Sequence, residues 1–386
     1  MGANILVQII GILIYPLLML NYSVSELSKY GVLYGGMTIL SVMITFKIEN
    51  LFFNIKIKEA LFFLNFYFKR VFVSVVILIA LIYFFLRIFF ERNANVDLFL
   101  LISFSAIFLG SFNIVYNFLV RARSLKYNLL KVIRVFLELF CVLVFSFIKI
   151  DIATLFFFVS LTYFIVVIYP VVGLLKKKTV SFCVKKRFEF LFYDLLSGLF
   201  NNIYLYSPNY FLYYGGAKEL SGYYFLINRI FGVPSLMIAQ SLSTALKQIL
   251  VSKNSTRYRI DLDYFNEKIF HKIYLIYFAL CCISIFAFYV ANFYYPGVFW
   301  VFIVLLPMLV LRFKFLSFSG LFYILRAYNF NLKIQFVLFF ISFLSAIIGY
   351  LINNSWISLI IYSLFTVLVY EYSFRYIYKY EKKVIE

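Results

Sequence analysis

The chain is divided into twelve apolar stretches, and this pattern limits its fold more than any other feature of the sequence. A helix of about 20 apolar residues crosses the roughly 30 Å hydrocarbon core of a bilayer. Apolar residues make up 65% of the chain and charged residues only 13%, a composition unlike that of soluble domains. We therefore predict an all-α polytopic membrane protein. The predicted spans are 3–20, 30–46, 71–90, 98–118, 129–148, 152–174, 189–213, 220–246, 272–290, 297–318, 332–350 and 355–374.

Two nearly identical five-residue segments lie half a chain apart. Residues 26–30 read ELSKY and residues 219–223 read ELSGY in a chain of 386 residues. An even number of predicted spans separates the two copies, so both lie on the same side of the membrane and the halves repeat in parallel. We predict two six-helix bundles, 1–178 and 179–386. Such internal repeats are typical of transporters whose halves move against each other.

The net charge of +20 is distributed unevenly along the chain. Most of the 36 Lys and Arg residues fall in the predicted loops on the side of both termini. The positive-inside rule makes this side cytoplasmic. Because the charge then orients the chain and contacts anionic headgroups, we predict membrane lipids as partners and no nucleic acid.

Residue types that most enzymes need are scarce. His271 is the one histidine, the four cysteines have no CxxC spacing, and no GxxxxGK[ST] phosphate-binding loop occurs. The sequence therefore lacks the residues and motifs that indicate a metal site, a disulfide framework or ATP hydrolysis. The predicted external loops are short, whereas a membrane polymerase needs a larger external segment to hold its polymer. We predict a transporter rather than an enzyme, with no cofactor and no metal.

Polar side chains inside the predicted spans are candidate site residues, because each costs energy in lipid unless it faces protein or a water-filled cavity. The seventh span carries Asp194, Asn201 and Asn202. Positions 194 and 201 share roughly one helical face at 3.6 residues per turn, which makes a polar stripe. For Asp194 the alternative is an acid at the membrane interface.

The eighth span carries Asn228, Arg229 and Gln240. Arg229 lies about seven residues, or roughly 10 Å, below the predicted outer interface. Its planar guanidinium suits a carboxylate or a phosphate. Arg229 either lines a substrate cavity or forms an intramembrane ion pair, with Asp194 or Glu138 as partner.

Three further charged residues leave alternatives open. Arg312 and Lys314, near the cytoplasmic end of the tenth span, either line a cavity or extend to the headgroups. Glu138, in the fifth span, follows Arg134 by one helical turn, so a local ion pair is the alternative to a functional role.

Two stretches, together about a quarter of the chain, resemble bacterial polysaccharide-unit exporters of the O-antigen flippase (Wzx) type. The stretch 4–60 has a first helix ending near a proline, an acidic loop before Tyr-Gly and a Lys-x-Glu step after the second helix. These features are Gln8, Pro16, Glu26, Tyr30, Gly31, Lys47 and Glu49. The stretch 220–249 is similar to the eighth helix of that family. It contains, in the family's order, Gly222, Tyr223, Asn228, Arg229, Pro234 and Gln248.

The resemblance implies the fold of the multidrug/oligosaccharidyl-lipid/polysaccharide (MOP) superfamily, which is MATE-like and has two six-helix bundles around a central cavity. It implies transfer of an undecaprenyl-diphosphate-linked oligosaccharide, such as an O-antigen unit for lipopolysaccharide, from the cytoplasmic to the periplasmic leaflet of the bacterial inner membrane. It also implies functional partners, a polysaccharide polymerase and chain-length proteins.

Within this family picture, the polar span residues become candidates for substrate binding and for H⁺ or Na⁺ coupling. Asp194 and Glu138 are the ion-coupling candidates. The substrate-binding candidates are Arg229, Asn228, Arg312, Lys314, Asn201, Asn202, Gln240 and Lys47.

Two other functions remain as alternatives. A small-molecule efflux antiporter of the same fold needs a carboxylate-rich cavity for cations, whereas the intramembrane charges here favour an anionic substrate. A membrane polysaccharide polymerase needs the large external loop that the sequence lacks.

Overall fold

A computed structural model of the chain describes residues 2–52, 55–89, 94–122, 126–175, 188–232, 235, 238–239, 242–243, 270–319 and 328–385. Over these residues the backbone is almost entirely helical and has no β-strand. Each of the twelve predicted spans falls wholly or partly on a described helix. Eight of the described helices are long and apolar enough to cross a membrane. The prediction of an all-α polytopic membrane protein is confirmed.

The chain forms two compact units, Met1–Tyr206 and Ser207–Glu386. The boundary falls within the long helix α9, Phe188–Tyr214, whose residues are therefore shared between the units. The two units are described separately below as unit 1 and unit 2.

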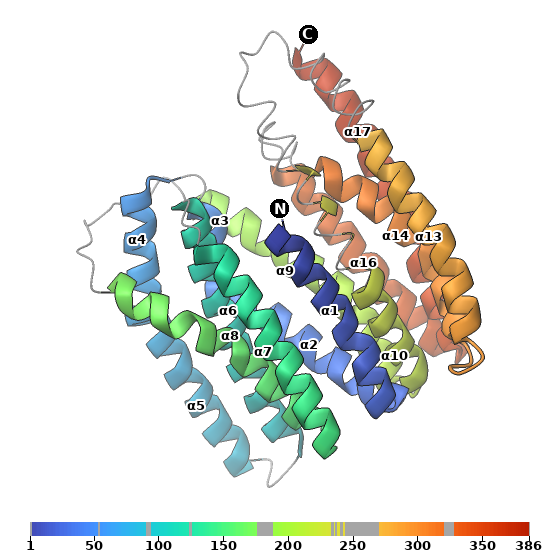
Figure 1. The fold of residues 1–386 in the computed structure, drawn as a ribbon. Helices are drawn as coiled ribbons and strands as arrows, with labels where there is room; N and C mark the ends of the chain where they lie inside the picture. The colour runs from blue at the N-terminus through green and yellow to red at the C-terminus, as the bar shows by residue number, and fades with distance from the viewer. Residues whose placement is uncertain are drawn as a thin grey trace. The chain divides into compact units, whose positions relative to one another are not determined.

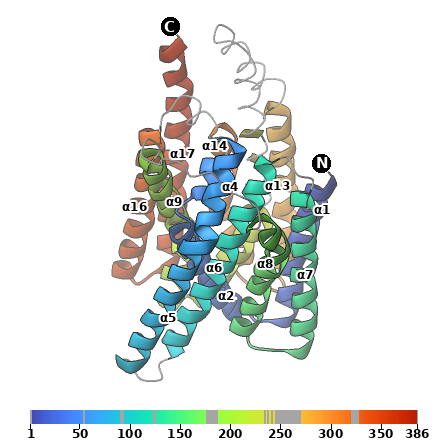
Figure 2. The same cartoon turned by 90° about the vertical axis from the view of Figure 1, so that its left-hand side faces the viewer.

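Unit 1 is a bundle of long helices (Figure 1). Before α9 it contains α1 Gly2–Asn21, α2 Val24–Thr45, α3 Ile48–Leu51, α4 Ile57–Phe66, α5 Phe72–Phe89, α6 Ala94–Arg121, α7 Lys126–Ile148 and α8 Ile152–Leu175. A π-helical turn, η2 at Tyr67–Val71, joins α4 to α5. Helix α6 packs against both α2 and α8, and α7 packs against both α1 and α8. Helices α5 and α6 lie side by side in both views (Figure 2).

Small residues and hydroxyl groups hold the unit 1 helices close together. A Cβ atom on Gly110 of α6 would lie 2.9 Å from Thr45 Cγ2 of α2, so only glycine allows this approach. The hydroxyls of Ser105 on α6 and Ser160 on α8 are 2.7 Å apart and form a buried hydrogen bond. Both devices are common between membrane helices, where lipid is as apolar as the protein and close packing replaces the hydrophobic effect.

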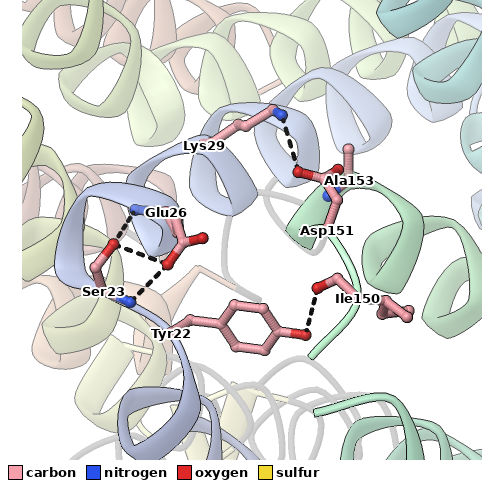
Figure 3. Close-up of polar contacts among 7 residues, drawn as sticks. All are labelled: Tyr22, Ser23, Glu26, Lys29, Ile150, Asp151 and Ala153. Atoms are coloured by element: carbon pink, nitrogen blue, oxygen red, sulfur yellow. Dashed lines mark hydrogen bonds and ion pairs between the residues drawn. The ribbon is translucent and has the colours of Figure 1, made fainter. Parts of the chain in front are cut away.

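The first repeat segment starts helix α2 (Figure 3). Ser23 is the N-cap, and its hydroxyl accepts from the backbone N–H of Glu26 at 3.3 Å. The Glu26 carboxylate in turn accepts from the backbone N–H of Ser23 at 2.8 Å. This capping box satisfies donors that a helix leaves unpaired at its start.

The start of α2 also contacts the connection between α7 and α8 (Figure 3). The Tyr22 hydroxyl donates to the backbone carbonyl of Ile150 at 3.0 Å, and Lys29 Nζ lies 3.5 Å from Asp151 Oδ1. Glu26 of the segment thus helps to start α2, while Tyr22 and Lys29 join this helix to the connection between α7 and α8.

Unit 2 follows the end of α9 and is again a helical bundle (Figure 1). It contains α10 Lys218–Ile227, the π-helical turn η4 Asn228–Gly232, α13 His271–Ala291, α14 Val298–Phe318, α16 Tyr328–Ile352 and α17 Ser355–Ile385. The second repeat segment forms the first turns of α10, as its counterpart does in α2. Helix α14 packs against α10, α13 and α17, and α16 packs along α17 (Figure 2).

Candidate functional site

Two buried arginines come together with an asparagine in unit 2. Arg229 in η4 is 7% exposed and Arg312 in α14 is 5% exposed. Arg312 Nη1 donates to Asn228 Oδ1 at 3.2 Å, and the Arg229 guanidinium carbon lies 5.4 Å from the centre of the Phe225 ring. The structure thus brings Arg312 into contact with Asn228, the chain neighbour of Arg229, and the sequence had singled out all three residues. We call Asn228, Arg229 and Arg312 the arginine cluster.

The local backbone of this cluster is unusual. Helix α10 changes at Asn228 into the π-helical turn η4, which ends at Gly232. π-Helical turns widen the helix and are frequent at functional sites. A Cβ atom on Gly232 would overlap Asn228 Oδ1 and would lie 3.6 Å from Arg312 Nη1. Glycine at this position therefore leaves the space in which Asn228 meets Arg312.

Lys314 lies apart from the arginine cluster. Its Nζ atom is 3.7 Å from Glu371 Oε2 of α17 and 3.9 Å from the centre of the Phe374 ring. Because Lys314 follows Arg312 by two residues on α14, the two side chains leave the helix on different faces. Lys314 therefore contacts α17, whereas Arg312 contacts the turn after α10.

In unit 1 the structure places Lys47 and Asp194 against the same short connection. Lys47 has a left-handed backbone conformation with φ of 55°, in the turn between α2 and α3. A Cβ atom on Gly198 of α9 would lie 2.7 Å from Lys47 Cε and 3.6 Å from its Nζ. One turn earlier on α9, Asp194 Oδ2 accepts from Asn50 Nδ2 at 2.6 Å.

The remaining polar residues of α9 follow on the next turns. Asn201 and Asn202 are both half-buried and belong to unit 1. Gln240, the last of the substrate-binding candidates, lies outside the described residues.

Glu138 forms the ion pair that its spacing allows. Its Oε2 atom lies 3.3 Å from Nη2 of Arg134, one turn earlier on α7. Arg134 Nη1 also donates to the Tyr163 hydroxyl of α8 at 2.8 Å. The guanidinium carbon is 4.8 Å from the Tyr163 ring centre and 5.8 Å from that of Phe112 on α6. Arg134 is therefore enclosed by a carboxylate, a hydroxyl and two aromatic rings.

This second basic cluster was not predicted from the sequence. Lys131 belongs to it as well, because its Nζ atom lies 4.6 Å from the Tyr116 ring centre. Lys131 and Arg134 both lie near the start of the predicted span 129–148, which became α7, Lys126–Ile148. The available signal was the spacing of Lys131, Arg134 and Glu138, which puts all three on neighbouring turns of one helix face.

The two clusters have a common chemistry. Each contains at least one guanidinium group that is buried or half-buried and lies next to an aromatic ring. Guanidinium binds phosphate oxygens through paired donors, and aromatic rings offer apolar faces with polar edges. Among the described residues there is no group of three or more His, Cys, Asp or Glu side chains placed to hold a metal ion.

Comparison with known proteins gives matches in structure alone. No family model matches the chain, and no curated protein matches it in sequence. One solved structure that it resembles is described as an inward-facing multidrug resistance MATE family transporter of the MOP superfamily. The TM-score is 0.68 at 14% identity, covering 97% of this chain and 95% of that one. A second is a MOP superfamily transporter from Pyrococcus furiosus, whose description reports a binding pocket of reverse polarity and suggests a different function.

That second match has a TM-score of 0.64 at 12% identity and covers 100% of this chain and 96% of the other. Both matches therefore extend over nearly the whole of each chain. The predicted MATE-like architecture is confirmed: the chain has the fold of MOP superfamily transporters.

Proposed function

We propose that the protein is a flippase that moves an undecaprenyl-diphosphate-linked oligosaccharide from the cytoplasmic to the periplasmic leaflet of the bacterial inner membrane by alternating access. The observation that carries the proposal is the arginine cluster, in which two arginines are buried in one unit. A diphosphate offers several anionic oxygens, and guanidinium groups are well suited to bind them. The fold supports a transport function, and the O-antigen-type substrate follows from the sequence resemblance.

Each candidate residue receives a role in this proposal. Arg229, Arg312 and Asn228 bind the diphosphate. Half-buried amides on α9, at Asn201 and Asn202, offer both donors and acceptors to sugar hydroxyls.

Four other residues are proposed for less direct roles. Gln240 extends the polar lining for the sugars, and Lys47 and Lys314 attract the anionic headgroup. Asp194 and Glu138 remain candidates for H⁺ or Na⁺ coupling. The exported unit would then pass to a polysaccharide polymerase and chain-length proteins.

An efflux antiporter for small molecules is the second candidate, because one structural neighbour is described as a multidrug resistance transporter. Cationic drugs require carboxylates in the binding site. The arginine cluster has the opposite charge. The description of the Pyrococcus furiosus neighbour reports a binding pocket of reverse polarity, and in this chain the buried arginines favour an anionic substrate.

Deletion of the gene tests the proposal directly. We expect surface polysaccharide to be lost and lipid-linked glycan units to accumulate on the cytoplasmic leaflet, measured by chemical labelling of glycan in inverted membrane vesicles. Restoration by a plasmid copy is the control. Unchanged surface glycan in the deletion strain, together with new sensitivity to cationic dyes, would instead favour the efflux antiporter.

A further inference from the structure

A carboxyl group outside the clusters described above is buried in unit 1. Glu49 belongs to the short helix α3, in the connection between α2 and α4, and is only 5% exposed. Its Oε1 atom accepts from the Thr45 hydroxyl at 3.4 Å, a long hydrogen bond. Its Oε2 atom is buried and has no hydrogen-bond partner. An ionised carboxylate in such a place is strongly disfavoured, and the group takes up a proton instead.

Two buried hydroxyl groups lie on neighbouring elements. Tyr67 in η2 and Ser111 in α6 are fully buried, and the oxygen of each side chain lacks a hydrogen-bond partner. The Tyr67 hydroxyl interacts electrostatically with the Glu49 carboxyl. It also lies 3.6 Å from where a Cβ atom of Gly110 would be, beside Thr45.

Buried polar atoms without partners are rare in native proteins, and each asks for an explanation. Three such oxygens, one of them a carboxyl oxygen, lie on α3, η2 and α6. A proton on Glu49 removes the unfavourable charge.

The charged groups that face Glu49 have opposing effects. Lys47, on the preceding turn, favours the ionised form, whereas Asp194 on α9 opposes it. Burial outweighs both and raises the pKa of Glu49 above its ordinary value. Arg121 of α6 is engaged elsewhere in the connection, because its guanidinium donates to the backbone carbonyls of Phe52 and Ile55, each at 3.0 Å.

We propose that Glu49 is the site at which the protein binds and releases the proton that drives its conformational cycle. While Glu49 stays buried, its carboxyl group is neutral. A rearrangement of the α2–α3 turn that admits water or brings the Lys47 ammonium closer ionises Glu49 and releases one proton to the cytoplasm. Lys47 is suited to this role, because its backbone is left-handed and its side chain packs against Gly198. Movement of the α2–α3 turn is therefore coupled to α9.

This inference rests on the proposed transport function and reassigns its ion coupling. The two acids chosen from the sequence both have partners in the structure, since Asp194 accepts from Asn50 and Glu138 pairs with Arg134. Glu49 has an unpaired oxygen instead.

The protonation state can be tested on the purified full-length protein in detergent. Dicyclohexylcarbodiimide reacts with protonated carboxyl groups in apolar surroundings, and mass spectrometry locates the adduct. We expect Glu49 to be modified near neutral pH and the modification to fall as the pH is raised, while the exposed Glu26 stays unmodified. Absence of an adduct on Glu49 throughout this range would overturn the proposal. Protection by sodium chloride but not by choline chloride would also overturn it, in favour of a sodium site.

The coupling role is tested with Glu49→Gln, which keeps the shape of the neutral carboxyl but cannot release a proton. We expect this variant to accumulate in the membrane at wild-type levels and to fail in restoring surface glycan to the deletion strain. Glu26→Gln, at an exposed position, is the control and should restore it. Full restoration by Glu49→Gln would contradict the coupling role. If the wild-type protein carries the adduct but deletion leaves surface glycan unchanged, the proton site stands and the proposed substrate is wrong.

Discussion

Arg229 is the residue on which the anionic substrate most depends. Replacing Arg229 by Ala removes a buried guanidinium from the arginine cluster, and we expect restoration of surface glycan to be lost while the protein still inserts. Arg229→Lys keeps the charge but not the planar pair of donors, so we expect only partial restoration. Surface glycan and membrane protein level are measured together. Arg375→Ala, which removes an arginine whose side chain is 77% exposed, is the matched control. Full activity of Arg229→Ala would leave Arg229 a purely structural residue.

Gly232 allows a test of the cluster that removes no charge. In Gly232→Ala the new methyl group overlaps Asn228 Oδ1, so Asn228 must move and its bond from Arg312 is broken. We expect reduced glycan export and a destabilisation of about 1–3 kcal/mol, the usual cost of overpacking. Gly173→Ala is the control, because no atom lies within 4 Å of the added carbon. Equal export by the two variants would show that the contact between Asn228 and Arg312 is dispensable.

The raised pKa of Glu49 predicts how the folding stability depends on pH. The folded protein holds a proton on Glu49 at pH values where the unfolded chain, with an ordinary pKa of about 4.3, has lost it. The folded state therefore binds more protons, and stability falls as the pH rises from that value through the folded pKa. We expect the melting temperature in detergent to decline less with pH in Glu49→Gln than in wild type. Parallel curves for the two proteins would show that Glu49 titrates normally.

The pairing of helices α16 and α17 depends on one close approach. A Cβ atom on Gly349 would overlap Ser358 Oγ and lie 2.7 Å from Ser358 Cβ. We expect Gly349→Ala to destabilise unit 2 by about 1–3 kcal/mol through overpacking, seen as a lower melting temperature. Adding Ser358→Gly removes the clashing atoms and should recover part of the loss, as expected for residues in direct contact. Additive effects of the two substitutions would mean that the helices do not meet at this point.

Helix positions were largely predictable from the sequence, and the polar details were not. The predicted span 272–290 became α13, His271–Ala291, because length and apolar character alone define a membrane helix. The predicted span 129–148 became α7, Lys126–Ile148, but the sequence did not show what surrounds the charges of Lys131 and Arg134 near its start. In the structure aromatic rings surround these cations within the helix bundle, a contact that local sequence does not reveal.

The residues of the candidate site were likewise predictable from the sequence, whereas their contacts were not. Arg229 and Arg312 were found because charged residues inside spans are rare and costly, but the contact of Arg312 with Asn228 needed the packing of α14 against α10. Glu49 appeared in the sequence only as part of a family-like motif. Its importance comes from burial against η2 and α6, elements that lie later in the chain.

The two repeat segments allow a test of how the whole chain crosses the membrane. Ser25 and Lys218 each lie immediately before one of the two copies, and both are exposed at the start of a helix. If six spans separate them, both face the periplasm, as the distribution of Lys and Arg also predicts. In a variant without the native cysteines, we expect Ser25→Cys and Lys218→Cys to react with a membrane-impermeant maleimide added to intact spheroplasts. Lys56→Cys, exposed on the opposite side by the same topology, should react only after the membrane is opened. Labelling of Ser25→Cys and Lys218→Cys from opposite sides would require an odd number of spans between the copies, and the parallel repeat would then be wrong.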